Sequence, residues 1–129
     1  MANQWQKIAL KNKVRMTKAA QESFIAASQS MIFKSPKDKG TFINNWFTEI
    51  NGVSTKFDDI ADKSGGRSAA SAVSDGRKIE IGDSISCVNN LPYNIKLEYG
   101  HSEQAPQGMV RITAAEWSTT VAKIAKGIK

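Results

Sequence analysis

Apolar residues recur at steps of three and four over residues 3–33, and neither glycine nor proline interrupts that stretch. At about 100° per residue this spacing predicts one long helix. The expected apolar face alternates small with large side chains, so we expect it to pack on a sheet or on a neighbouring subunit's helix. Its members are Trp5, Ala9, Met16, Ala20, Phe24, Ala27 and Met31.

Two later stretches have strand character. Proline at position 36 ends the long helix, because proline disfavours helix at the residue before it. β-branched and aromatic residues then predict a strand over 45–53. Alternation over 78–89 predicts two short strands, joined by a hairpin turn at Gly82 and Asp83.

Residues 54–76 have the weakest pattern in the chain. They contain Ser-Gly-Gly-Arg-Ser at 64–68, and the alanines from 69 onward favour a short helix at most, over 69–73. A stretch this long without a clear element is typical of a disordered segment or a functional arm. We therefore predict a flexible arm or loop over 54–76.

The end of the chain is again helical. Pro92 predicts the start of a short helix over 93–99, and residues 101–108 read as a loop. Thr-Ala-Ala-Glu at 113–116 has the pattern of a capping box, which predicts that the last helix begins there. The element order predicts one α+β domain over 1–129: a small antiparallel sheet packed against a long N-terminal helix and a C-terminal helix, with a long extended loop or arm.

Composition limits the chemistry. The chain has 129 residues, with one cysteine and one histidine. A disulfide within the chain, a cysteine-based zinc site and a histidine-rich metal site are therefore excluded. No apolar run is long enough to span a membrane, and early lysines break any signal-peptide pattern. We expect a protein that stays in the cytoplasm that makes it, without metal or cofactor.

The residues also argue against an enzyme. Cys87 lies in a predicted strand with no basic neighbour to lower its thiol pKa, which favours a small core residue. His101 stands beside Ser102 and Glu103, but adjacent loop residues point in different directions and seldom form a catalytic relay. We expect no catalytic activity.

Positive charge is concentrated at the N-terminal end. The chain has 18 basic and 12 acidic side chains, a net charge of +6, and residues 1–34 hold six of the basic and one of the acidic ones. A basic stripe is expected opposite the apolar face of the first helix, formed by Lys7, Lys11, Arg15 and Lys18. Such a stripe is either a solvated face or a contact for an acidic protein or for nucleic acid. No helix-turn-helix, zinc pattern or base-stacking aromatic pair is present, so sequence-specific DNA recognition is not expected.

Residues 89–109 read NNLPYNIKLEYGHSEQAPQGM. This stretch resembles a hallmark of the tailed-bacteriophage neck proteins, a family of tail-completion, minor tail and head–tail joining proteins. Residues 36–46, PKDKGTFINNW, resemble the same family's Pro-x-Asp-Thr-Gly…Trp motif, with Lys39 where the family usually has Thr. In the 89–109 stretch, Asn94 stands where the family usually has Ala. The motif positions are Pro36, Gly40, Trp46, Asn89, Pro92, Tyr93, Glu98, Gly100 and Pro106.

Several motif residues have an expected physical role. Asn89 or Asn90 ends a strand, where an amide side chain can bond the backbone of the turn. Glu98 is expected to anchor a loop amide or a basic partner. Gly100 permits a left-handed backbone at the end of the short helix. We expect subunit contacts in the two polar segments, at Gly65, Gly66, Arg67, His101, Ser102 and Gln104.

The resemblance implies a structural virion protein. Copies would form a ring of six or twelve at the neck, which completes the tail or joins it to the head, with DNA passing through the lumen. The implied partners are copies of the chain and other neck, connector and tail proteins, with no membrane. We expect the basic stripe to face an acidic protein neighbour. The alternative is a small basic protein that binds nucleic acid non-specifically.

Overall fold

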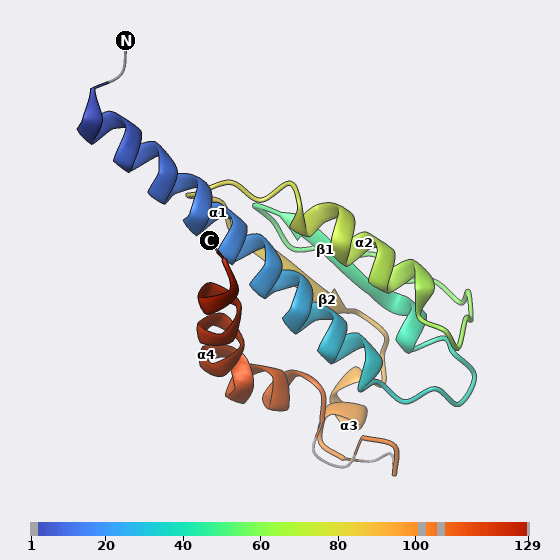
Figure 1. Ribbon diagram of the computed structural model, residues 1–129. Helices are drawn as coiled ribbons and strands as arrows, with labels where there is room; N and C mark the ends of the chain where they lie inside the picture. The colour runs from blue at the N-terminus through green and yellow to red at the C-terminus, as the bar shows by residue number, and fades with distance from the viewer. Residues whose placement is uncertain (1–2, 101–102, 106–107, 129) are drawn as a thin grey trace.

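The computed structural model describes residues 3–100, 103–105 and 108–128. Figure 1 shows the α+β fold that the sequence predicts, with a long N-terminal helix, a C-terminal helix and a two-stranded antiparallel sheet. In chain order the elements are α1 (Gln4–Phe33), the 3₁₀ turn η1 (Ile43–Asn45), β1 (Trp46–Ile50), α2 (Gly66–Gly76), β2 (Ile85–Asn89), α3 (Asn94–Glu98) and α4 (Val110–Gly127).

Helix α1 organises the fold. It contacts α2 along one part of its surface and α4 along another, and α2 also packs on β1. In the sheet, Trp46 pairs with Asn89, Thr48 with Cys87, and Ile50 with Ile85. A two-stranded sheet is marginally stable alone, so the helices must supply most of its apolar cover.

The core lies where α1, the β1 strand and the chain after β2 meet. Its buried members are Met31, Ile32, Phe42, Ile43, Trp46, Ala72, Leu91, Ala105 and Met109. The Phe42 and Trp46 rings meet edge to face, with their centroids 5.7 Å apart. The indole N–H of Trp46 donates to the Ser35 hydroxyl at 2.8 Å, so the polar atom of this buried ring is satisfied.

The predicted apolar face of α1 is wrong over most of its length. Of its members only Met31 is buried, whereas Trp5 is 77% exposed and Met16 is 60% exposed. The buried side chains are instead those of Ser23, Ile25, Ser28, Met31 and Ile32, all in the second half of the helix. Most of the first half projects beyond the rest of the described fold (Figure 1), and among the described residues only the end of α4 and the turn after α2 approach it.

The prediction for residues 54–76 is wrong in its second half. Residues 53–62 have no helix or strand, as expected, but α2 is an 11-residue helix and its side chains pack on α1 and β1. Its buried residues, Ser68, Ala72 and Gly76, are small and spaced four apart. A Cβ atom on Gly76 would lie 2.5 Å from Cγ1 of Ile25, so this helix approaches α1 too closely for a larger residue.

Two local predictions near the second strand and the last helix are also wrong. Residues 79–84 form turns instead of the first strand of a hairpin, and β2 pairs with the distant β1. Helix α4 begins at Val110, so Thr113 lies inside it and its hydroxyl donates to the Met109 carbonyl at 2.7 Å. The cap of α4 comes from another element.

Candidate functional site

The motif stretch begins with two asparagines, Asn89 and Asn90, whose side chains link three segments of the chain. The Asn89 side-chain N–H donates to the Phe42 carbonyl at 2.9 Å, and its side-chain oxygen accepts from the Leu91 N–H at 3.2 Å. Asn90 donates to the carbonyls of Ser54 and Lys56, at 2.8 and 3.1 Å. The expectation that these amides bond backbone at the strand end is confirmed for both.

Glu98, at the end of α3, caps α4. Its Oε1 accepts from the backbone N–H groups of Met109 and Val110, each at 2.8 Å, and its Oε2 accepts from that of Arg111 at 2.9 Å. The expected anchoring of a loop amide is confirmed at Met109, and the carboxylate also pairs with the Arg111 side chain at 3.1 Å. These N–H groups would otherwise lack a partner within the helix.

The electrostatics of Glu98 follow from this geometry. Partial burial acts to raise its pKa, but the three backbone N–H groups and Arg111 outweigh it and lower the pKa below the usual 4.5. The charged carboxylate is therefore the form that the fold stabilises.

Two glycines make this arrangement possible. Gly100 has φ +86°, the left-handed backbone expected of it. Gly108 has φ +83°, and a Cβ atom there would lie 2.4 Å from the Glu98 carbonyl oxygen. The sequence analysis did not single out Gly108, although a glycine directly before a helix was a usable signal.

Two further motif residues, Pro92 and Tyr93, form an exposed edge before α3. Pro92 is exposed, and Tyr93 is exposed with its ring 6.1 Å from that of Phe42. Burial, and then the charge of Asp59, raises the pKa of Tyr93. Beside this edge a groove of about 440 Å³ opens between β2, α3 and the start of α4. The groove offers an apolar surface next to the motif.

The motif residues of the 36–46 stretch are buried. Pro36 and Trp46 are buried, and Gly40 is buried with φ +87°. The Gly40 carbonyl accepts from the N–H groups of Asn44 and Asp62, at 3.2 and 3.1 Å. A Cβ atom on Gly40 would lie 2.5 Å from the Lys63 nitrogen. The glycine thus allows the 53–62 segment to close over the motif.

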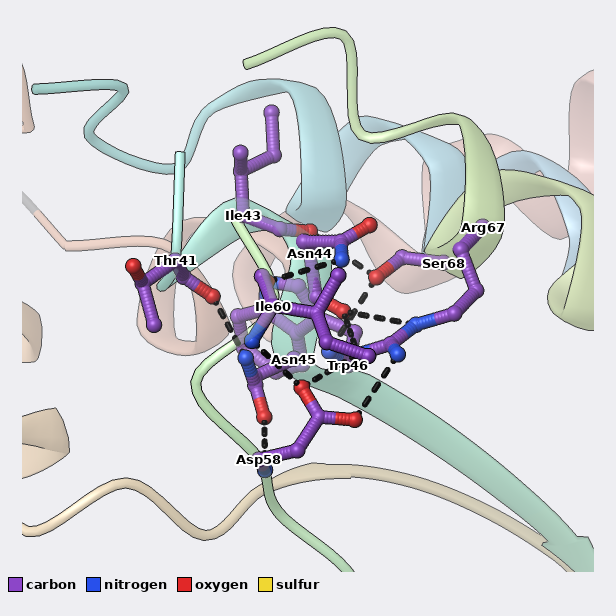
Figure 2. Close-up of polar contacts among 9 residues, drawn as sticks. All are labelled: Thr41, Ile43, Asn44, Asn45, Trp46, Asp58, Ile60, Arg67 and Ser68. Atoms are coloured by element: carbon purple, nitrogen blue, oxygen red, sulfur yellow. Dashed lines mark hydrogen bonds and ion pairs between the residues drawn. The ribbon is translucent and has the colours of Figure 1, made fainter. Parts of the chain in front are cut away.

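Figure 2 shows how that segment is held. The Asp58 N–H donates to the Asn45 side-chain oxygen at 2.8 Å, and the Asn44 side chain donates to the Ile60 carbonyl at 2.9 Å. Arg67 donates to both Asp58 carboxylate oxygens, at 2.8 and 3.0 Å, and to the Asn44 carbonyl. The hydrogen bond from Arg67 lowers the pKa of Asp58. The segment is a strap pinned to the body, not a free arm.

Among the expected subunit-contact residues that the structure describes, Arg67 and Gly65 make contacts within the chain. Arg67 directs its guanidinium at Asp58 and Asn44 and lies over the Phe47 ring, so its polar groups are occupied within the chain. Gly65 is buried against Ile43, whereas Gly66 is exposed.

Gln104 likewise serves the chain itself. Its side-chain oxygen accepts from the Lys37 N–H at 2.7 Å, and its side-chain N–H donates to Asp38 at 2.5 Å. Gln104 thus fastens its loop to the turn after α1. The other loop candidates, His101, Ser102 and Pro106, lie outside the described residues.

The basic stripe lies on the projecting half of α1. Lys7, Lys11, Arg15 and Lys18 are all exposed. The end of α4 approaches this region, and a shallow groove there is lined by Arg15, Met16, Ala125 and Ile128, among others. Lys123 and Lys126 on α4 are exposed too and add to the positive charge of this end of the molecule.

The structure bears on the candidate chemistry at two points. Burial raises the pKa of the Cys87 thiol to about 12, as expected of a packed residue that is not a nucleophile. In the described part of the chain no group of three or more His, Cys, Asp or Glu side chains is placed to hold a metal ion. Over those same residues no helix combines the length and hydropathy needed to cross a bilayer.

No family model, no curated protein and no solved structure matches the chain.

Proposed function

We propose that the chain is a structural virion protein of a tailed phage, which assembles as a ring at the head–tail interface and completes the tail or joins it to the head. The observation that carries this proposal is the uncovered first half of α1. Its exposed apolar side chains are Trp5, Ile8, Leu10, Val14 and Met16, from 44% to 77% exposed. A run of large exposed apolar groups on a well-formed helix is typical of a surface that another protein covers.

The motif geometry supports the same proposal. Asn89, Glu98 and Gly108 all shape the segment between β2 and α4. The Asn89 amide bonds the Phe42 carbonyl, the Glu98 carboxylate accepts from the Met109 N–H, and Gly108 leaves room for the Glu98 backbone. Trp46 packs on Phe42, whose carbonyl accepts from the Asn89 side chain, and this joins the upstream motif to the same region. The residues that carry the family resemblance are thus a connected structural unit, which is what a shared fold requires of them.

The experiment is electron microscopy of lysates from a phage with an early stop codon in this gene. We expect filled heads beside separate, finished tails, restored to whole particles when the intact gene is supplied from a plasmid. Overlong or ragged tails would assign a tail-terminating role instead. Normal infectious particles would contradict the proposal.

Non-specific nucleic-acid binding is a second candidate, favoured by the absence of any acidic residue before Glu22. The stripe of four basic residues would contact about four phosphates. The logarithm of the binding constant should then fall with the logarithm of salt concentration with a slope of about −3 to −4, from roughly −0.9 per contact. Absence of binding near physiological salt would dismiss this candidate.

A further inference from the structure

The projecting segment, residues 4–18 of α1, carries a high positive charge and also exposes apolar side chains to solvent. It contains Lys7, Lys11, Lys13, Arg15 and Lys18 and no acidic residue. Leu10 and Val14 are 63% and 60% exposed and lie beside the basic side chains. Nucleic-acid backbone would satisfy the charge but leave these apolar groups in water, so a protein surface that is both apolar and acidic fits the segment better.

The chain carries such a surface at one end of its sheet. Residues 46–55 and 79–89 contain Glu49, Glu80 and Asp83 and no basic residue. Asn51 ties the two stretches together, donating to Asp83 at 3.0 Å and accepting from the Ser84 N–H at 2.9 Å. We call this region the acidic sheet end.

The acidic sheet end also presents apolar groups. Val53 is 66% exposed and Ile81 is 47% exposed. Glu49 and Glu80 are exposed as well, so their charges are available to a partner. The negative charge of the acidic sheet end is therefore complementary to the positive charge of the projecting segment, and both surfaces expose apolar side chains.

The far end of the projecting segment cannot reach the acidic sheet end of its own copy. Gln21 donates to the Ile79 carbonyl at 2.8 Å, which places the acidic sheet end beside the middle of α1. The helix continues without a break from there to its start at Gln4. At about 1.5 Å per residue, Trp5 lies about 24 Å further along the axis, beyond the range of unscreened attraction between exposed charges.

We propose that residues 4–18 of one copy lie along the acidic sheet end of a second copy. The contact joins different surfaces of the two copies, so it is head-to-tail and can close into a ring. This inference rests on the proposed function and specifies how its subunits would meet.

The test is a charge exchange between two variants. The first is Lys7→Glu/Lys11→Glu/Arg15→Glu, and the second is Glu49→Lys/Glu80→Lys. Asp83 is left unchanged, because it bonds Asn51 and the Glu80 N–H within the chain. The control, Lys39→Glu/Lys63→Glu/Lys96→Glu, reverses three exposed lysines that lie outside both surfaces. Circular dichroism checks that every variant is folded, and sedimentation measures its mass.

The wild-type chain and the control should associate. Each charge-reversed variant alone should have a dissociation constant at least about 100-fold higher, because like charges then face each other. A mixture of the two variants should associate again, since a reversed segment meets a reversed sheet end. Restoration in the mixture cannot arise from misfolding.

Three results would overturn the inference: a monomeric wild-type chain, variants that still associate alone, or a mixture that stays dissociated. Association only in the presence of DNA would assign the segment to nucleic acid instead. Rings that form through another surface would overturn this contact and leave the neck function intact, whereas infectious particles without the gene product would remove the function itself.

Discussion

The Arg111 side chain contacts Glu98 at two points. The Arg111 Nε donates to Oε2 of Glu98 at 3.1 Å, and its Nη2 donates to the Glu98 backbone oxygen at 2.5 Å. Arg111 also lies over the Tyr99 ring, 4.5 Å from its centroid. A residue in the first turn of α4 thus fixes the residue that caps α4, and α3 and α4 become one unit across the loop between them.

Removing the Glu98 carboxylate should destabilise this unit. We expect Glu98→Ala to lower the free energy of unfolding by about 2–3 kcal/mol, because three backbone N–H groups lose a charged acceptor. Glu98→Gln, which keeps the shape and one acceptor, should cost about 1 kcal/mol. Denaturant unfolding measures both. The exposed Glu103→Ala is the control and should stay within about 0.5 kcal/mol of wild type.

The same carboxylate gives the stability a pH dependence. The folded-state pKa of Glu98 lies below the usual 4.5, so its contribution is fully present above that value and is lost as the pH falls through the lowered folded pKa. We expect wild type to lose more stability than Glu98→Gln between about pH 5 and pH 3. Unfolding titrations at a series of pH values test this. Parallel curves for the two proteins would contradict it.

Two glycines with left-handed backbone should differ in their tolerance of alanine. Gly40 has φ +87°, and a Cβ atom there would clash with the Lys63 backbone nitrogen. Gly82 has φ +101°, but a Cβ atom there would have open space around it. Gly82→Ala should therefore cost only the backbone strain, about 1 kcal/mol. Gly40→Ala should cost about 2–4 kcal/mol, because the strap must also move. Thermal unfolding of the pair measures the difference, and equal losses would rule out the close approach.

The strap over residues 53–62 should loosen when its pin is removed. Arg67→Ala deletes the hydrogen bonds to Asp58 and to the Asn44 carbonyl. We expect amide hydrogen exchange at Ile60 to rise about tenfold, since its N–H bonds the Asp58 carboxylate that Arg67 holds in place. Lys63→Ala, an exposed neighbour, serves as the control. Unchanged exchange in Arg67→Ala would mean that the asparagines alone hold the strap.

Local signals in the sequence were sufficient for several elements. The long helix was predicted over 3–33 and runs from Gln4 to Phe33, with Asn3 as its cap. A strand near β1 and a turn after Pro36 were predicted from β-branched residues and proline. The roles of Asn89, Glu98 and Gly100 were also predicted from residue type and position. For the helix, the strand and the turn, the residues that decide the structure are neighbours in the chain.

The missed features depend on distant partners. Helix α2 buries Ser68, Ala72 and Gly76, which carry no apolar period, and its position becomes favourable only because α1 and β1 lie close enough to need small residues. The capping box at Thr113 has the right residues, yet Glu98 from α3 caps α4 one turn earlier. No local pattern reports a cap that arrives from another element.

The sequence by itself determined the α+β class, the extent of α1 and the surplus of basic residues at its start. Only the tertiary structure decided which side of α1 is buried, that residues 53–62 are a pinned strap, and that the first half of α1 is left bare. The physical reason is that periodicity defines which residues share a helix face, but burial depends on where the other elements end. Here α2 reaches α1 at Ile25, and beyond the body the apolar and basic residues of α1 remain available to another molecule.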